Sequence, residues 1–205
     1  MQINIDRKTG VLLGVIVLLS AAVLSLSINR NDHDGMGRSN GHMGHGSMGS
    51  QSSQYTGADI MFLQMMIPHH QQAIDISNLA LKTTKDSELQ ALSKTIIKAQ
   101  STEIEQMKSW LKDAGASIEI DHAMGHGMGG MLDDAQLSEL NAASGSKFDV
   151  LWLKGMIAHH EGAIHMTGMI NDADNPEIKT FGENIIKDHS AQIEQMKAML
   201  IRLGA

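Results

Sequence analysis

The 205-residue sequence contains no cysteine, only two prolines and 3% aromatic residues. Without cysteine the chain can form no disulfide and offers no thiolate to a metal ion. With so few aromatic side chains, methionine, leucine, isoleucine and alanine must build the hydrophobic core. Basic residues are not clustered and the formal net charge is -7, so a nucleic-acid partner is not expected.

Methionine and histidine are abundant instead, with sixteen and eleven copies in the chain. A chain of this length can bury a hydrophobic core and still carry additional segments. Where these two residue types recur along the sequence is therefore the feature that bears on function.

The N-terminal segment predicts export. Arg7 and Lys8 precede an uncharged apolar run from Val11 to Ile28, which as a helix is about 27 Å long and can just cross a bilayer core. The positive flank favours a cytoplasmic N-terminus, with the following domain facing the periplasm or cell exterior. Residues 1–28 are predicted to be a single transmembrane anchor. A signal peptide cleaved near Ser25-Leu26-Ser27, which would release the protein, remains the alternative, and a buried core helix is less favoured.

Two segments combine glycine with histidine and methionine. Residues 29–57 are poor in apolar bulk and predict a flexible tail, while residues 116–132 predict a linker between helices. Ordinary linkers use Ser, Glu or Lys, whereas these interleave thioethers and imidazoles. We interpret both as segments for secondary metal capture rather than plain spacers, with the candidate residues His42, Met43, His45, Met48, His122, Met124, His126 and Met128.

Residues 58–205 predict an all-α domain. Apolar residues at heptad-like spacing predict a short helix at 133–143 and four long helices at 59–81, 85–114, 148–170 and 176–203. Gly115 is placed to end the second long helix and Pro176 suits the first turn of the last.

The long helices also carry an internal repeat. The stretch MIPHHQQAI (66–74) recurs as MIAHHEGAI (156–164), and IEQMKSWL (104–111) recurs as IEQMKAML (193–200). Each half then forms a helical hairpin whose wide apolar face needs the other hairpin to cover it. The repeat predicts a four-helix bundle made of two duplicated hairpins.

The repeated motif is Met-x-x-His-His. Adjacent helical residues project about 100° apart, yet both histidines fall on the wide apolar face, and Met66 stands one turn before His69 and His70. Met156 stands likewise before the second pair. Thioether beside imidazole suits Cu(I), with Ag(I) as its mimic, whereas imidazole alone suits Cu(II) or Zn(II) equally. The motif therefore predicts copper binding through one such group in each half.

The facing helices add further candidates. Gln100 and His189 take equivalent positions there, and the C-terminal half is richer in donors. Gln100, Glu103 or Gln192 could orient the histidine rings. Core packing is the alternative role for each methionine, and hydrogen bonding is the alternative role for each histidine. Asp59 and Asp149 lie near predicted helix starts, where capping or interaction with the helix dipole explains them. The predicted metal ligands are Met66, His69, His70, Met107, Met156, His159, His160, His165, Met166, Met169, His189 and Met196.

The motif Met-Ile-x-His-His-x-x-Ala-Ile, followed by a helix with Ile-x-x-Met, resembles the family called domain of unknown function 305. The resemblance covers about 55–203 and both copies of the motif. It implies a ferritin-like four-helix bundle, often duplicated, and a kinship with exported copper-binding proteins implicated in copper tolerance. It implies copper ligands at Met66, His69, His70, Met156, His159 and His160.

Enzymatic alternatives lack their motifs. The sequence has no Glu-x-x-His pair of the di-iron enzymes, and His160 to His165 is one residue too long for a zinc-protease His-Glu-x-x-His. We therefore predict a non-enzymatic, exported protein that captures or sequesters copper for homeostasis or tolerance. Its expected partners are metal ions and, through residues 1–28, the membrane; the sequence leaves open whether it delivers metal to another protein. The alternative is a helical module that binds another protein through adaptable methionines, without obligatory metal.

Overall fold

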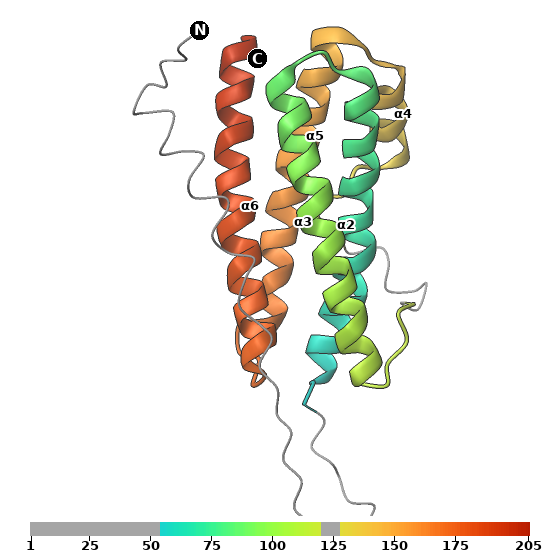
Figure 1. The fold of residues 1–205 in the computed structure, drawn as a ribbon, viewed down its shortest axis with the longest axis vertical. Coiled ribbons are helices and arrows are strands. Elements are labelled where there is room, and N and C mark those ends of the chain that lie inside the picture. Colours follow the sequence, from blue (N-terminus) through green and yellow to red (C-terminus); the bar gives the residue numbers. More distant parts are fainter. Residues whose placement is uncertain (1–53, 120–127) are drawn as a thin grey trace, which may run out of the picture. The chain divides into compact units, whose positions relative to one another are not determined.

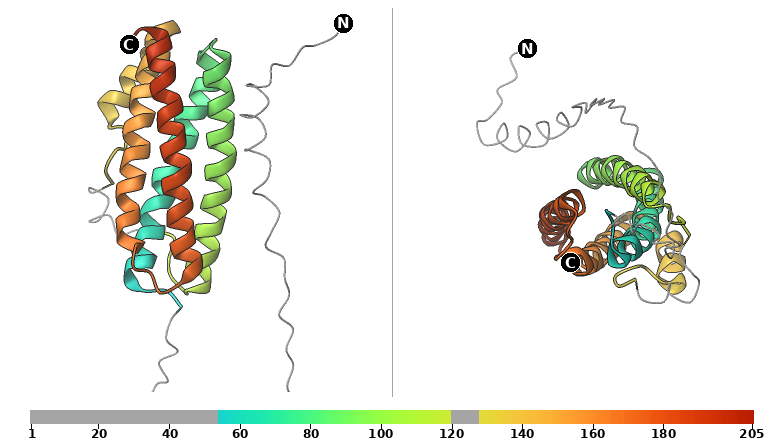
Figure 2. Two further views of the ribbon diagram at one scale, coloured as in Figure 1. Left: turned by 90° about the vertical axis from the view of Figure 1, so that its left-hand side faces the viewer. Right: turned by 90° about the horizontal axis from the view of Figure 1, so that it is seen from below.

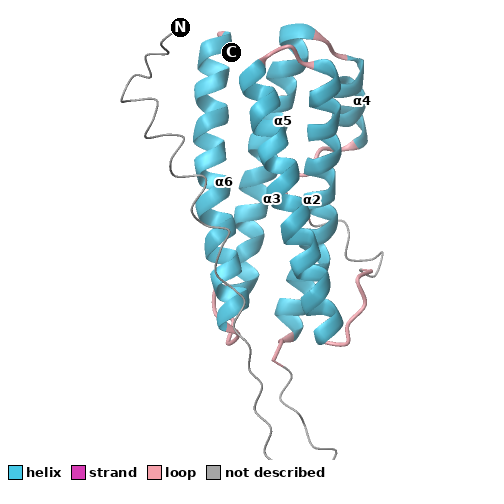
Figure 3. Ribbon diagram, in the orientation of Figure 1, coloured by secondary structure: helices cyan, strands magenta, loops and turns pink. Residues whose placement is uncertain are grey.

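The computed structural model describes residues 54–119 and 128–205, which are helices and loops with no strand (Figures 1 and 3). The all-α prediction is confirmed. The elements are α2 (Gly57–Thr83), α3 (Ser87–Asp113), α4 (Asp134–Ala142), α5 (Gly145–Met166), the 3-10 turn η2 (Thr167–Ile170) and α6 (Pro176–Leu203).

The predicted anchor or signal peptide at 1–28 and nearly all of the tail at 29–57 lie outside the described residues, as does the linker segment 120–127. Among the helices that the structure describes, none is long and apolar enough to cross a membrane. The roles assigned to His42, Met43, His45, Met48, His122, Met124 and His126 stay predictions.

Side-chain caps fix most helix starts. The Thr56 hydroxyl accepts from the Asp59 amide, and the Asp59 carboxylate accepts from the Thr56 amide, which forms a capping box at α2. Asp86 caps α3 and Asn175 caps α6, with Pro176 at the first helical position. The capping role for Asp59 is therefore confirmed.

Asp149 has no such role. Helix α5 starts at Gly145, so Asp149 lies a full turn inside it, and its Oδ1 is buried without a hydrogen-bond partner. The same helix ends at Met166 and tightens into η2, so the regular helix is shorter than the predicted 148–170. The other helix bounds agree with the prediction to within about two residues.

The long helices pack as two antiparallel pairs, α2 with α3 and α5 with α6, and the pairs meet mainly through α2 and α5 (Figures 1 and 2). The Trp152 indole donates to the Ile76 carbonyl at 3.0 Å across this contact. Helices α3 and α6 do not pack closely against each other.

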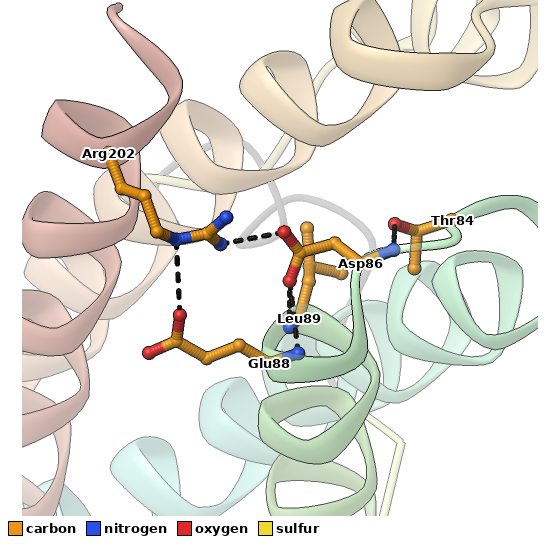
Figure 4. Close-up of polar contacts among 5 residues, drawn as sticks. All are labelled: Thr84, Asp86, Glu88, Leu89 and Arg202. Atoms are coloured by element: carbon orange, nitrogen blue, oxygen red, sulfur yellow. Dashed lines mark hydrogen bonds and ion pairs between the residues drawn. The ribbon is translucent and has the colours of Figure 1, made fainter.

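Polar side chains join α3 to α6 near the two ends of the domain. At one end, Arg202 bridges Asp86 at 2.7 Å and Glu88 at 3.3 Å (Figure 4). Burial alone would raise the pKa of Asp86, but hydrogen bonds from the Leu89 amide and Arg202 outweigh it and lower that pKa. At the other end, the Trp110 indole donates to Glu177 at 3.3 Å.

The core divides into two apolar clusters along the helix axes. One, the Phe62 cluster, includes Phe62, Leu63, Met66, Ile104, Met107, Trp110, Met166, Ile178 and Ile185. The other, the Trp152 cluster, includes Ile76, Leu89, Leu92, Ile96, Phe148, Trp152, Met156, Ile193, Met196 and Met199. Where one cluster gives way to the other, each long helix places a buried histidine or glutamine at the core.

The end of the linker forms a strap, Gly129–Leu132, across α2 and α5. Gln72 donates to the Leu132 carbonyl at 2.9 Å and accepts from the Leu132 amide at 2.8 Å. A Cβ on Gly162 would lie 1.8 Å from the Gly129 carbonyl oxygen, and Gly130 has a positive φ of 83°. The strap therefore depends on glycine on both sides of its contact with α5.

Candidate metal centre

Five histidines and one glutamine form a buried layer between the Phe62 and Trp152 clusters. We call it the histidine layer: His69 and His70 from α2, Gln100 from α3, His159 and His160 from α5, and His189 from α6. Each of these side chains is at most 2% exposed. Polar groups so deeply buried cost free energy unless they are paired, so the layer is unlike an ordinary bundle core.

The rings of the two halves are in contact. The His69 and His159 ring centroids lie 3.8 Å apart, and those of His160 and His189 lie 4.2 Å apart. His70 and His189 follow at 5.8 Å. The structure thus brings both histidine pairs and His189 into one cluster, whereas sequence reasoning treated the two halves separately.

Oxygen atoms accept hydrogen bonds from the Nε2 atom of several rings. The Nε2 of His69 donates to the Gly129 carbonyl at 3.2 Å, and that of His159 donates to the His69 carbonyl at 2.9 Å. Carbonyl oxygens only accept hydrogen bonds, so these two rings carry their proton on Nε2. His160 Nε2 lies 2.6 Å from Gln192 Oε1 in the same arrangement.

The Nδ1 atoms have no such partner. In the part of the chain that the structure describes, Nδ1 of all five histidines is buried without a hydrogen bond, as is Nε2 of His189. Each such unpaired nitrogen lowers the free energy of unfolding by about 1–3 kcal/mol. In a neutral ring protonated on Nε2, Nδ1 carries the lone pair that binds a metal ion.

Burial also keeps the rings neutral. Burial, together with the neighbouring histidines, lowers the pKa of His69 and His160 to about 4 and that of His159 and His189 well below 6.5. Neutral imidazole is the form that coordinates metal ions. These four rings are therefore ready to bind a cation without first losing protons at neutral pH.

Thioethers border the layer on both sides. Met66, Met107 and Met166 belong to the Phe62 cluster, whereas Met156 and Met196 belong to the Trp152 cluster. Because α2 and α5 are antiparallel, the methionines of the two repeated motifs lie on opposite sides of the histidines. Soft sulfur donors are thus available from either direction.

Three other predicted residues lie elsewhere. His165 is exposed, Met169 is partly buried against the Phe62 cluster, and Met128 is partly buried next to the strap. Within 54–119 and 128–205, no group of three or more His, Asp or Glu side chains is already arranged to hold a metal ion.

The orienting residues agree in part with expectation. Gln192 contacts His160 as expected, whereas Glu103 Oε2 lies 2.8 Å from His70 Nε2 without forming an aligned hydrogen bond, and both amide atoms of Gln100 are buried without a partner. The Gly129 carbonyl was not anticipated. In the sequence, only the Gly-Gly pair at 129–130 indicates that the linker backbone can lie close against the helices.

Comparison with known proteins identifies the family. A family model described as domain of unknown function (DUF305) matches residues 59–200. The chain belongs to the DUF305 family. The resemblance inferred from the Met-Ile-x-His-His motif is confirmed. A search among curated proteins gave no significant match.

Solved structures of similar proteins share this fold. One from Streptomyces coelicolor, provisionally described as secreted, is 27% identical with a TM-score of 0.67, covering 72% of this chain and 94% of that chain. CopM in its Cu(I)-bound form is 31% identical with a TM-score of 0.60, covering 72% and 97%. CopM in its Cu(II)-bound form is 32% identical with a TM-score of 0.58, covering 70% and 96%. Its Ag-bound form, obtained by soaking, is 32% identical with a TM-score of 0.59, covering 73% and 97%.

Proposed function

We propose that this DUF305 protein binds copper in the histidine layer, with Cu(I) favoured over Cu(II) and Ag(I) as a mimic. The observation that carries the proposal is the set of five buried imidazoles whose Nδ1 atoms have no partner. A buried polar atom left unpaired indicates a role other than stability. CopM, which is bound to copper or silver in related structures, supports the choice of metal.

The proposed ligands fall into an inner and an outer set. The inner set is the five histidines of the layer, completed by thioethers from Met66, Met107, Met156 or Met196, all of them fully buried. The outer set, in which metal would bind more weakly, comprises His165, Met166, Met169 and the Met/His-rich tail and linker. Imidazole with thioether and no thiolate favours Cu(I) and Ag(I) over Zn(II).

We further propose that the domain is a ferritin-like four-helix bundle that arose by duplication of one hairpin. Met66 and Met156 stand one turn before their histidine pairs, and both methionines and all four of these histidines are fully buried. Export, through an anchor or signal peptide at 1–28, is proposed on the sequence and on the Streptomyces coelicolor relative. In that compartment the protein would capture or sequester copper for homeostasis or tolerance.

A titration of the full chain with Cu(I) or Ag(I) tests the proposal. Replacing His159 by Ala removes one ligand and the hydrogen bond to the His69 carbonyl, and should abolish the tightest site. His165→Ala is the matched control, because it removes an exposed histidine from the same helix. Loss of the tightest site in both variants, or in neither, would contradict a centre in the histidine layer.

A protein-interaction module remains the second candidate. It requires methionines at the surface as an adaptable contact area. Met66, Met107, Met156 and Met196 are all 0% exposed, so the methionines of the repeated motifs cannot serve that purpose. We also propose binding rather than catalysis, since the descriptions of the relatives name metals and no reaction.

A further inference from the structure

The long side of the domain between α3 and α6 differs from the side opposite. Helices α3 and α6 do not pack closely, and the side-chain contacts that join them lie near their ends. On the opposite side, α2 and α5 pack together and the strap closes over them, with the Gly129 carbonyl on His69. The histidine layer is therefore more tightly covered from the α2–α5 side.

Glu103 of α3 connects solvent to the layer. Its side chain is 20% exposed, yet its Oε2 is buried and lies 2.8 Å from Nε2 of His70. The His70 ring itself is fully buried. The two atoms are close but not aligned as a hydrogen bond, so neither atom has a well-made partner.

Asp188 of α6 is the second carboxylate of this region. It is exposed and directly precedes His189, whose ring belongs to the layer. Burial and the negative charge of Glu103 raise the pKa of Asp188, and Lys187 partly opposes this. Glu103 lies beside His70, and Asp188 adjoins His189 in sequence, whose ring centroid is 5.8 Å from that of His70, so the two carboxylates belong to the same pair of rings.

We propose that Glu103 and Asp188 form the port through which a soft monovalent cation enters the histidine layer, Glu103 passing it to His70. Two carboxylates on helices α3 and α6 attract a cation and raise its local concentration. Carboxylate oxygen is a hard donor that holds Cu(I) weakly, so the ion moves on to nitrogen and sulfur. This inference rests on the proposed copper site and adds the route to it.

The experiment measures the rate of Cu(I) uptake by the full chain, with the ion supplied as a weak complex. Quenching of Trp152 fluorescence in a Trp110→Phe background reports arrival at the layer, because Trp152 packs in the same cluster as Met156. The port variant is Glu103→Gln with Asp188→Asn. The control is Glu105→Gln with Glu183→Gln, which removes two exposed carboxylates from the same two helices.

The port variant should take up Cu(I) about tenfold more slowly at low ionic strength, and salt should narrow that difference. Its copper content at equilibrium should match the wild type, and the control should change little. Equal slowing in both variants, or an unchanged rate, would overturn the port. A fall in equilibrium content would overturn it too, since Glu103 would then be a ligand. Failure of the copper site itself would be recognised separately. In that case Cu(I) would still quench Trp152 fluorescence after His159→Ala in the same Trp110→Phe background.

Discussion

The Nε2 atom of His159 donates a hydrogen bond to the backbone carbonyl of His69, 2.9 Å away, and the two rings lie 3.8 Å apart. A ring of the C-terminal half is thus oriented by the backbone of the N-terminal half. A backbone carbonyl cannot be removed by substitution. It can accept a hydrogen bond from Nε2 only when the ring is the tautomer that carries its proton on Nε2. The contact therefore fixes the tautomer of His159 and leaves its Nδ1 for a metal ion.

This contact predicts an outcome for spectroscopy of the metal-free protein. Long-range proton–nitrogen correlation spectra should show His69, His159 and His160 as the Nε2-protonated tautomer at neutral pH. Addition of Ag(I) should then shift the Nδ1 resonances of the ligating rings and leave Nε2 protonated. Exposed His165 serves as the internal reference. A metal-induced shift confined to Nε2 would rule out the proposed coordination.

Met156 should tune the choice of metal. Met156→Leu conserves side-chain volume, so the free energy of unfolding should change by less than about 1.5 kcal/mol. Binding of Cu(I) or Ag(I) should weaken, because a soft sulfur donor is lost, whereas Zn(II) bound through imidazole should be spared. Competition titrations with the three metals measure this.

Met199→Leu is the matched control for that experiment. Met199 is also buried in the Trp152 cluster, but the matching residue of the first repeat is Trp110, so methionine does not recur at this position. It should leave all three affinities unchanged. Equal weakening of Cu(I), Ag(I) and Zn(II) by Met156→Leu would reduce Met156 to a packing role.

Sequence periodicity predicted the helices well because the signals are local. Apolar spacing, Gly115 and Pro176 act within one or two turns, and the helix bounds follow them. The repeated Met-x-x-His-His motif also identified the buried histidines. Heptad position alone places both rings of each pair on the core side.

The contacts between the halves could not be read in the same way. No local pattern specifies that His69 meets His159, or that His160 meets His189, because these distances depend on how the two helix pairs dock. The Gly129 carbonyl on His69 depends on the path of a glycine-rich linker, which carries no apolar periodicity. His165 shows the opposite case: its type suggested a ligand, but its helical position turns it to solvent.

Glycine at position 162 should prove necessary for the strap. In Gly162→Ala the new Cβ would meet the Gly129 carbonyl oxygen at 1.8 Å, so the strap must move away from α5 and from His69. We expect a loss of about 1–3 kcal/mol in the free energy of unfolding, as for other overpacked sites. Amide exchange at Gly129–Leu132 should accelerate.

Gly168→Ala controls for the general effect of adding a methyl group. A Cβ at Gly168 would meet no atom within 4 Å, and its backbone is not left-handed. Denaturant titrations should therefore give a lower free energy of unfolding for Gly162→Ala than for Gly168→Ala. A Gly162→Ala protein as stable as Gly168→Ala, with unchanged exchange at the strap, would contradict the close packing of strap and helix.

Acid should destabilise the metal-free protein in a definite window. Burial lowers the pKa of His69 and His160 from 6.5 to about 4, so below pH 6.5 the unfolded chain takes up protons that the folded chain does not. Protons then favour the unfolded state, and the free energy of unfolding falls as the pH drops from 6.5 to about 4. Each ring contributes at most about 3 kcal/mol to this loss. The full stabilisation is present above pH 6.5.

Chemical denaturation between pH 7.5 and 4 measures the effect, with two variants to assign it. His160→Gln should flatten the pH dependence because it removes one buried titrating ring, whereas His165→Ala should not, because that ring is exposed. Bound Ag(I) should suppress the acid loss, since a metal on Nδ1 competes with the proton for the same lone pair. An unfolding free energy that stays constant from pH 6.5 to 4 without metal would mean that the layer accepts protons freely, and its histidines would not be the dry, neutral ligands proposed.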